Sequence, residues 1–397
     1  MSIASVTVHL EGTTLEGGGQ ILRLALSLSS LTRTPIHISN IRGKRHGGGG
    51  LKSQHLTSLK WLGQACNAST TGAQLKSKEI TFAPDTAHRN DTVKTGAVEI
   101  KQDTPGSVNL VFQAVLPYLL FSGAEEKIRL TITGGTNVSN SPSYDYIAQV
   151  LIPMLTLIGA PSIETELHAR GWSQGGTCLG RATYTITPLR HQLPAFHLIE
   201  RGAMRSVNAT IIAPKDTEQH FRDELDVMFD NLEPRISTPP ATITFDTTFE
   251  DSHHPKRYYI LLVATTTTGM KLGRDWLFDQ AIRPGKTEHI VPTMVRKVAG
   301  DLMREIEHEG CVDEFLRDQL VVFQALALSG SRVEGGKGKL SMHALTARWV
   351  AEQILGVEFS DDGSCGGVGY HPGGAGEDRD VNEELVGELE RVTLGRG

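Results

Sequence analysis

The chain has 397 residues and a formal net charge of −6, from 39 Lys and Arg against 45 Asp and Glu. A protein that coats nucleic acid without regard to sequence is usually basic, so any RNA binding here would need a local basic patch. No run of 18 or more apolar residues occurs, which argues against a transmembrane helix, and four scattered cysteines without a CxxC pair argue against a zinc site or a disulfide framework.

The N-terminal half alternates between strand and helix patterns, which predicts an α/β or α+β chain. The strand–helix rhythm recurs before residue 185 and indicates repeated βαβ-type units, although no sequence period is sharp enough to prove them. The predicted strands are 5–10, 35–41, 79–83, 96–101, 127–133 and 162–168, and the predicted helices start near 21 and 56 and span 108–120 and 146–158.

A change of composition near residue 189 and two breaker motifs, PP and HHP, indicate a small α/β domain inserted at 190–285. We therefore expect a first core part at 1–189 and a second core part at 286–397, with a flexible Gly-rich acidic loop near 361–385. The predicted elements are strands 206–213, 241–247, 258–265 and 389–394, and helices 218–229, 291–306 and 312–328.

Two glycine clusters each precede a helix pattern. In EGGGQILR, residues 16–23, the glycines allow close approach of the backbone to a ligand, Arg23 could reach an anion and Glu16 could hold a divalent cation. In residues 41–55, Arg42 and Arg45 flank four glycines and predict a second anion site. The alternatives are a tight turn and a basic loop, and neither cluster is a P-loop, because GxxxxGK[ST] is absent.

Two further segments carry candidate chemistry. His343 follows a Gly/Lys-rich loop at a helix start, where a neutral imidazole could attack the α-phosphorus of a nucleotide. Phe315 and Asp318 share one helical turn, with a ring for base stacking and a carboxylate for a metal. Taken alone, a single His is more often structural, and a core Phe beside a surface Asp is the simpler interpretation.

Together these segments resemble the RNA 3′-terminal phosphate cyclases. The resemblance runs through EGGGQILRLALSLSSLT, IRGKRHGGGGLKSQHLTSLKWL, FQAVLPYLLF, TGGTNVSNSPSYDYIAQVLIPML, FLRDQLVVFQALA and HALT, most of the chain outside 185–285 and the tail. It implies a core of βαβ-type repeats like that of RNA 3′-phosphate cyclases and enolpyruvyl transferases, with a small inserted α/β domain. It also implies ATP and Mg²⁺ or Mn²⁺ as cofactors, and RNA with a 3′-phosphate as the partner.

The resemblance further implies a three-step reaction. Histidine attacks ATP to give a histidine–AMP adduct, AMP passes to the RNA 3′-phosphate, and the 2′-hydroxyl displaces AMP to close a 2′,3′-cyclic phosphate. By position in the motifs, the nucleophile is His343 and the metal ligands are Glu16 and Asp318. The implied nucleotide- and phosphate-binding residues are Arg23, Arg42, Arg45, Gln54, His55, Gln113, Pro142, Asp145 and Phe315, with Pro142 and Phe315 enclosing the adenine.

Departures from the family pattern occur at Ala347, where Asn is usual, in residues 170–181 and in the glycine turn 47–50. Two alternatives stay open: a non-catalytic cyclase-like protein of ribosomal RNA processing, and an enolpyruvyl transferase. The first is disfavoured because that group lacks the nucleophilic histidine, and the second because the resemblance lies in the motifs. A nuclear location is expected, with the cytoplasm as the alternative.

Overall fold

The computed structural model describes residues 6–45, 47–86, 96–237, 242–282 and 287–374, and the strand predicted at 389–394 lies outside them. Four mixed sheets and the helices that cover them form the described part, which confirms the prediction of a mixed α/β chain. None of the described helices combines the length and apolar character needed to cross a bilayer.

The first two sheets share one connection order. In each, two parallel strands joined by a helix are followed by a second helical segment and two antiparallel strands. The first unit contains β1 (Val8–Glu11), α1 (Gly19–Thr32), β2 (Ile36–Ser39), α2 (Ser53–Ala65), β3 (Ser69–Thr71) and β4 (Ile80–Ala83). The second contains β5 (Ala97–Lys101), α3 (Val108–Leu120), β6 (Ile128–Gly134), α4 (Tyr144–Tyr146), a π-helical turn η1 (Ile147–Leu151), α5 (Ile152–Leu157), β7 (Ile163–Ala169) and β8 (Gly180–Ile186).

A third, smaller sheet follows the same alternation. Strand β14 pairs in parallel with β9 and antiparallel with β15, which reproduces part of the order of the first two sheets. Its elements are β9 (His197–Leu198), α8 (Glu314–Leu326), β14 (Ser331–Val333), α9 (Met342–Leu355) and β15 (Ser364–Cys365). The long interruption between β9 and α8 contains the fourth sheet.

The fourth sheet forms a small unit with its own hydrophobic core, separate from that of the other three sheets. Its elements are β10 (Met204–Ala213), a 3₁₀ turn η2 (Lys215–Thr217), α6 (Glu218–Ile236), β11 (Thr244–Asp251), β12 (Tyr259–Thr266), β13 (Lys271–Leu277), a second 3₁₀ turn η3 (Thr287–His289) and α7 (Ile290–His308). The apolar side of α7, including Met294 and Val298, packs into this core. The sequence analysis counted α7 with the main core instead, because its amphipathic pattern does not reveal which sheet it covers.

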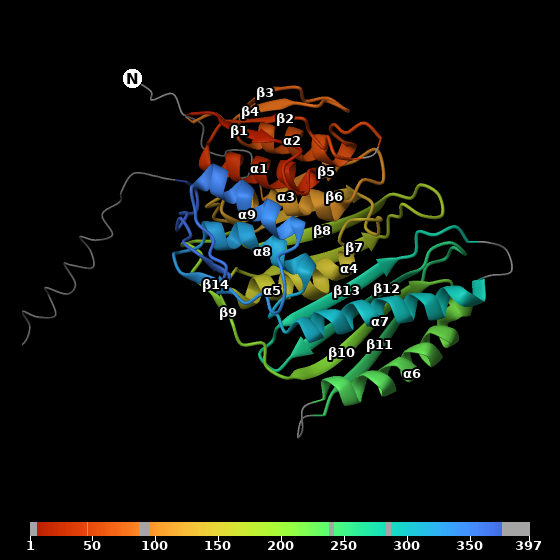
Figure 1. Ribbon diagram of the computed structural model, residues 1–397. Coiled ribbons are helices and arrows are strands. Elements are labelled where there is room, and N and C mark those ends of the chain that lie inside the picture. Colours follow the sequence, from red (N-terminus) through yellow and green to blue (C-terminus); the bar gives the residue numbers. More distant parts are fainter. Residues whose placement is uncertain (1–5, 46, 87–95, 238–241, 283–286, 375–397) are drawn as a thin grey trace, which may run out of the picture.

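Helices α1, α3, α8 and α9 pack on one another between the sheets (Figure 1). Helix α1 is almost continuously buried, with polar Ser27, Ser29 and Ser30 in the interior. A strand followed by a helix and a parallel strand places the helix start at the carboxyl edge of the sheet. The repeated order therefore gathers the starts of several helices in one region of the molecule.

Most predicted elements occur near their predicted bounds, and helix 108–120 matches α3. Strands β8 and β13 and the shorter β3, β9, β14 and β15 were not predicted. Strand β13 has a weak pattern because Gly273 and the charged Arg274 and Asp275 interrupt its apolar residues. Part of the segment predicted as a flexible loop contacts the core, since the Tyr370 hydroxyl donates to the Leu31 carbonyl at 2.7 Å.

The Asp313 carboxylate joins three elements at the boundary between the core and the small unit. It is fully buried and accepts hydrogen bonds from the Tyr146 hydroxyl (2.7 Å), the Gly273 N–H (2.8 Å) and the Leu316 N–H (2.9 Å). Burial raises the pKa of Asp313 to about 6, against the opposing effect of these donors. One side chain thus caps α8 and ties it to α4 and to β13.

We predict that Asp313→Ala lowers the free energy of unfolding by about 3 kcal/mol or more, because three buried donors lose their acceptor. Asp313→Asn keeps one acceptor oxygen, so its loss should be smaller. Urea denaturation followed by circular dichroism measures both variants. A loss for the alanine variant below about 1 kcal/mol would contradict this role of the carboxylate.

Candidate active site

A cavity of about 390 Å³ opens where α1, α3, α8 and α9 meet β12 and β13 of the small unit. Residues from both ends of the chain line it, together with the loop 137–143 that precedes α4. Six of the side chains singled out in the sequence share its wall: Arg23, Gln113, Pro142, Phe315, Asp318 and His343. The sequence separation between Arg23 and His343 shows that the fold, rather than chain proximity, assembles the cavity.

The start of α9 presents His343 to the cavity. The Ser341 hydroxyl caps the helix by accepting from the Ala344 N–H at 3.2 Å. Nδ1 of His343 lies 2.9 Å from Oε1 of Gln20 on α1. Burial, followed by the positive charges of Arg23 and Arg45, lowers the pKa of His343, so the ring is neutral at pH 7. A neutral imidazole retains a lone pair that can act as a nucleophile.

A second contact holds α9 against the N-terminal turn. The backbone N–H of Glu16 donates to the Thr346 hydroxyl at 3.1 Å, and that hydroxyl donates to the Met342 carbonyl at 2.7 Å. Ala347 follows directly and is fully buried in the core. The chain therefore has a small apolar residue at a position that faces packed side chains and not the cavity.

Arg23 is a cation without a hydrogen-bonding partner among the described residues. Burial lowers its pKa to about 10, while the nearby Asp318 carboxylate acts in the opposite direction. Burial also raises the pKa of Asp318 to about 7, partly offset by Arg23 and by the hydrogen bond from Gln20. A guanidinium enclosed at a cavity wall with free donors is suited to bind an anion.

Further positively charged side chains lie near Arg23, outside the residues that line the cavity. Arg42 donates to the Gly50 carbonyl at 3.1 Å, and Arg45 pairs with Glu16. Buried His55 has its pKa lowered to about 3 by burial and then by Arg23, Arg42 and Lys52, so it is neutral at all physiological pH values. The charge in this region is therefore supplied by arginine and lysine.

The glycines of residues 17–19 are required by close contacts. Gly17 has a φ of 63°, in the left-handed region that favours glycine. A Cβ at Gly18 would overlap the Glu16 carboxylate, and one at Gly19 would overlap His55 and approach Arg23. The motif thus allows two side chains of the site to lie directly against the α1 backbone.

The aromatic end of the cavity contains Phe315, which is 42% exposed. The Arg274 guanidinium lies 4.2 Å from its ring centroid, and the Tyr146 ring meets its edge. Pro142 and Trp276 line the same cavity. An accessible ring and a proline on the wall of one cavity are suited to hold a flat base.

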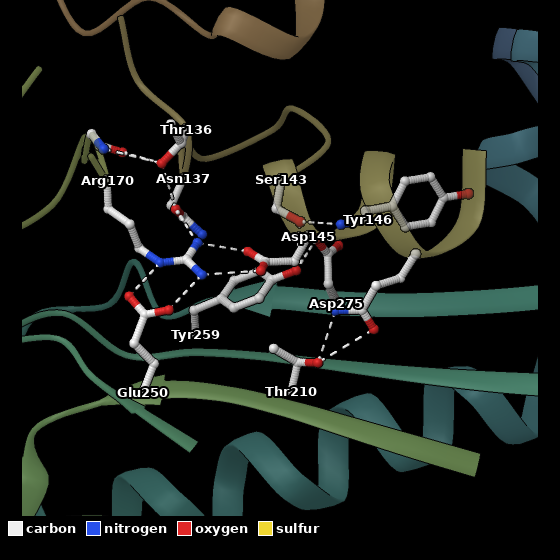
Figure 2. Close-up of polar contacts among 12 residues, drawn as sticks. Thr136, Asn137, Ser143, Asp145, Tyr146, Arg170, Thr210, Glu250, Tyr259 and Asp275 are labelled. Carbon is white, nitrogen blue, oxygen red and sulfur yellow. Dashed lines mark hydrogen bonds and ion pairs between the residues drawn. The ribbon is translucent and has the colours of Figure 1, made fainter. Parts of the chain in front are cut away.

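The small unit meets the core beside this end through two polar clusters. Figure 2 shows Arg170 between two carboxylates, at 2.8 Å from Asp145 in the core and 2.6 Å from Glu250 on β11. The hydroxyls of Ser143 and Tyr259 lie 2.5 Å apart, and Tyr259 also donates to Asp275 on β13 (Figure 2). Asp145 is thus paired with Arg170 and is not among the residues that line the cavity.

Two glutamines that the sequence singles out, Gln54 and Gln113, form hydrogen bonds within the chain. The Gln54 oxygen accepts from the Ser107 N–H at 3.1 Å, just before α3, and the Gln113 amide donates to Gln319 at 2.5 Å. Gln113 lines the cavity, whereas Gln54 lies behind it at the α2 start.

The environment of Glu16 has one feature that a bound divalent cation would satisfy. Among the residues that the structure describes, its buried Oε2 atom has no hydrogen-bond partner, while Oε1 pairs with Arg45. An orphaned carboxylate oxygen is what a cation would satisfy. The described part of the chain has no group of three or more His, Cys, Asp or Glu placed to hold a metal, so further ligands would have to come from the substrate or water.

The sequence analysis missed residues that come from the small unit and from α1. Tyr259, Asp275 and Trp276 line the cavity, but no pattern in β12 or β13 marks them as site residues. Gln20 lies inside the quoted EGGGQILR motif, three residues before Arg23 and so on the same side of the helix. That spacing is a signal by which Gln20 could have been found.

Comparison with known proteins shows the family of the chain. A family model described as RNA 3′-terminal phosphate cyclase matches residues 14–360. Curated proteins named RNA 3′-terminal phosphate cyclase are similar to the chain: 31% identical in Pyrococcus furiosus (91% of this chain, 97% of the relative), 34% in Staphylothermus marinus (88% and 92%) and 31% in Drosophila melanogaster (94% and 95%). The chain belongs to the RNA 3′-terminal phosphate cyclase family.

We predict that His343 titrates below its ordinary pKa of 6.5, because burial and nearby cations disfavour the charged ring. Arg45→Gln removes one of these cations, so protonation becomes easier and the pKa should rise. NMR titration of ¹⁵N-histidine, with the His343 signal assigned from a His343→Gln sample, measures the shift. Lys215→Gln, on the small unit, should leave the value unchanged, and a wild-type pKa above 6.5 would contradict the prediction.

Proposed function

We propose that the protein uses ATP to convert an RNA 3′-phosphate into a 2′,3′-cyclic phosphate through a covalent histidine–AMP intermediate. The observation that carries the proposal is that a neutral imidazole, His343, and a guanidinium without a hydrogen-bonding partner in the described part, Arg23, line one cavity. A nucleophile and a cation for the developing charge are the two groups that attack on a phosphate requires. Membership of the family implies the use of ATP.

In the first step, the Nε2 lone pair of His343 attacks the α-phosphorus of ATP. The bond to the bridging oxygen breaks, and pyrophosphate leaves with that electron pair. Arg23, with Arg42 and Arg45 behind it, offsets the negative charge that accumulates on the phosphates. Phe315 and Pro142 hold the adenine, so the α-phosphorus is presented to the ring.

In the second step, an oxygen of the RNA 3′-phosphate attacks the same phosphorus and the histidine leaves. The adjacent 2′-hydroxyl then attacks the 3′-phosphorus, AMP departs, and the cyclic phosphate closes. DNA lacks this hydroxyl, which explains the requirement for RNA. The net charge of −6 means that the strand is recognised locally, and Arg42, Lys44, Arg45 and Lys52 supply a basic patch beside the cavity.

Glu16, through its orphaned Oε2, would hold a Mg²⁺ or Mn²⁺ ion, with Asp318 as the second predicted ligand. When bound, the ion supplies charge neutralisation at the triphosphate. The protein itself contributes the Glu16 carboxylate, which pairs with Arg45 near the start of α1. We expect the ATP phosphates to bind there. Because the described residues offer so few ligands, ATP oxygens would complete the coordination.

We also infer that the three sheets outside the small unit are copies of one βαβ-type repeat, the architecture expected for RNA 3′-phosphate cyclases and enolpyruvyl transferases. Their shared connection order supports this interpretation. The small unit interrupts the third copy and adds β12 and β13 to the cavity wall.

We predict that wild-type protein incubated with magnesium and α-labelled ATP acquires label that is stable to alkali and labile to acid, as a phosphoramidate is. His343→Ala should abolish the label, because no other imidazole replaces the nucleophile. His253→Ala, which removes an exposed ring on the small unit, should label like wild type. Persistent labelling of the His343→Ala protein would overturn the assignment.

We predict that Phe315→Ala weakens ATP binding about 5- to 150-fold, because base stacking on an aromatic ring contributes about 1–3 kcal/mol. Phe315→Trp keeps a stacking surface and should bind nearly as wild type. Isothermal titration with a non-hydrolysable ATP analogue measures both affinities. Equal affinity for the alanine variant and wild type would show that the ring does not contact the base.

A further inference from the structure

Gln20 connects two groups of the cavity and has a defined orientation. It is the second residue of α1 and is 4% exposed. Its Nε2 donates to Oδ2 of Asp318 at 2.6 Å, and its Oε1 lies 2.9 Å from Nδ1 of His343. A side chain with both ends engaged and no freedom to reach solvent is held in one rotamer.

We propose that Gln20 is a positioning residue that keeps the proton of His343 on Nδ1, so that Nε2 carries the lone pair used in adenylylation. The proposal rests on the proposed function, because it takes His343 as the nucleophile.

The hydrogen-bond donors and acceptors of Asp318, Gln20 and His343 determine which ring nitrogen carries the proton. An ionised carboxylate only accepts, so Asp318 draws the amide N–H₂ of Gln20 toward itself. The amide oxygen then faces His343, and because that oxygen only accepts, Nδ1 must donate. In the neutral ring the second nitrogen, Nε2, is left without a proton. No other hydrogen-bond partner of the ring occurs within the ranges that the structure describes.

A carboxamide suits this task better than a carboxylate. A carboxylate beside the ring would also orient it, but its charge would raise the pKa of the imidazole and favour the protonated form. The protonated ring has no lone pair for attack. Gln20 orients the ring without adding charge, while Arg23 and Arg45 add charge of the sign that keeps the ring neutral.

The hydrogen bond between Gln20 and His343 also acts in the second step, in which AMP passes to the RNA 3′-phosphate. When Nε2 of the neutral ring bonds to the α-phosphorus, Nδ1 keeps its proton and the ring of the adduct becomes positively charged. When the RNA phosphate attacks, the N–P electron pair returns to Nε2 and the ring leaves neutral. Gln20 Oε1, as acceptor, keeps the proton on Nδ1 in that charged adduct, so the ring leaves as neutral imidazole and not as imidazolate.

The test compares Gln20→Met with a matched control. Methionine has a similar length and no acceptor oxygen. Gln324→Met makes the same replacement at a glutamine that is 3% exposed and donates to the Gly363 carbonyl, away from the cavity. The full-length proteins are measured at pH 8.0 by single-turnover adenylylation with α-labelled ATP and by ¹⁵N-histidine NMR.

We expect wild-type His343 to show the Nδ1–H tautomer. In Gln20→Met the ring should show a mixture of tautomers, and adenylylation at saturating ATP should slow about 10- to 100-fold. ATP affinity should change by less than about threefold, because the lost contact is not made to the nucleotide. Gln324→Met should retain both the wild-type tautomer and the wild-type rate.

Gln20→Glu provides a second, independent variant. It keeps an acceptor, so the Nδ1–H tautomer should persist, but the added charge should raise the pKa of His343. A wild-type ring protonated on Nε2, or a Gln20→Met protein with wild-type rate and tautomer, would overturn the Gln20 proposal. Label on His343→Ala would instead overturn the proposed function, so the two failures are distinguishable.

Discussion

The proposed chemistry depends on the docking of the α9 start against the α1 start. Two hydrogen bonds, from Glu16 to Thr346 and between His343 and Gln20, join residues more than 320 positions apart. Both are made at the starts of these helices, of which only α9 has a side-chain cap, so small displacements would separate the imidazole from the cations of the N-terminal turn. Base stacking and charge neutralisation contribute to the proposed reaction only when the imidazole stays close to these cations.

The site also concentrates unsatisfied polar groups. Within the described ranges, Arg23 has no hydrogen-bonding partner, and Oε2 of Glu16 is buried without one. Such groups destabilise a folded protein, and they persist where a ligand completes them. The surrounding core offsets the cost with long buried helices, and carboxylates such as Asp313, with three donors, are fully satisfied. Along the boundary between the core and the small unit, some residues thus stabilise the fold and different residues are available to bind a ligand.

Much of this could be predicted from the sequence because the informative residues lie in contiguous motifs. Gly17–Gly19 preceded a helix as expected, and the helix 108–120 and the mixed α/β class followed from periodicity. The contribution of β13 could not be predicted, since Asp275 and Trp276 lie in a strand whose sequence pattern is weak and whose approach to the core depends on tertiary contacts. Likewise, Gln20 is one polar residue of a motif, and only the positions of His343 and Asp318 show what it contacts.

The placement of His343 on α9, near the last elements of the described chain, has a consequence for biosynthesis. Chains emerge from the ribosome N-terminus first, so the glycine turn and Arg23 are made long before the imidazole that faces them. A nascent chain can therefore fold its first sheets and still be unable to react with nucleotide. The order of synthesis would act as a safeguard, in which ATP is consumed only by molecules that have been translated beyond α9.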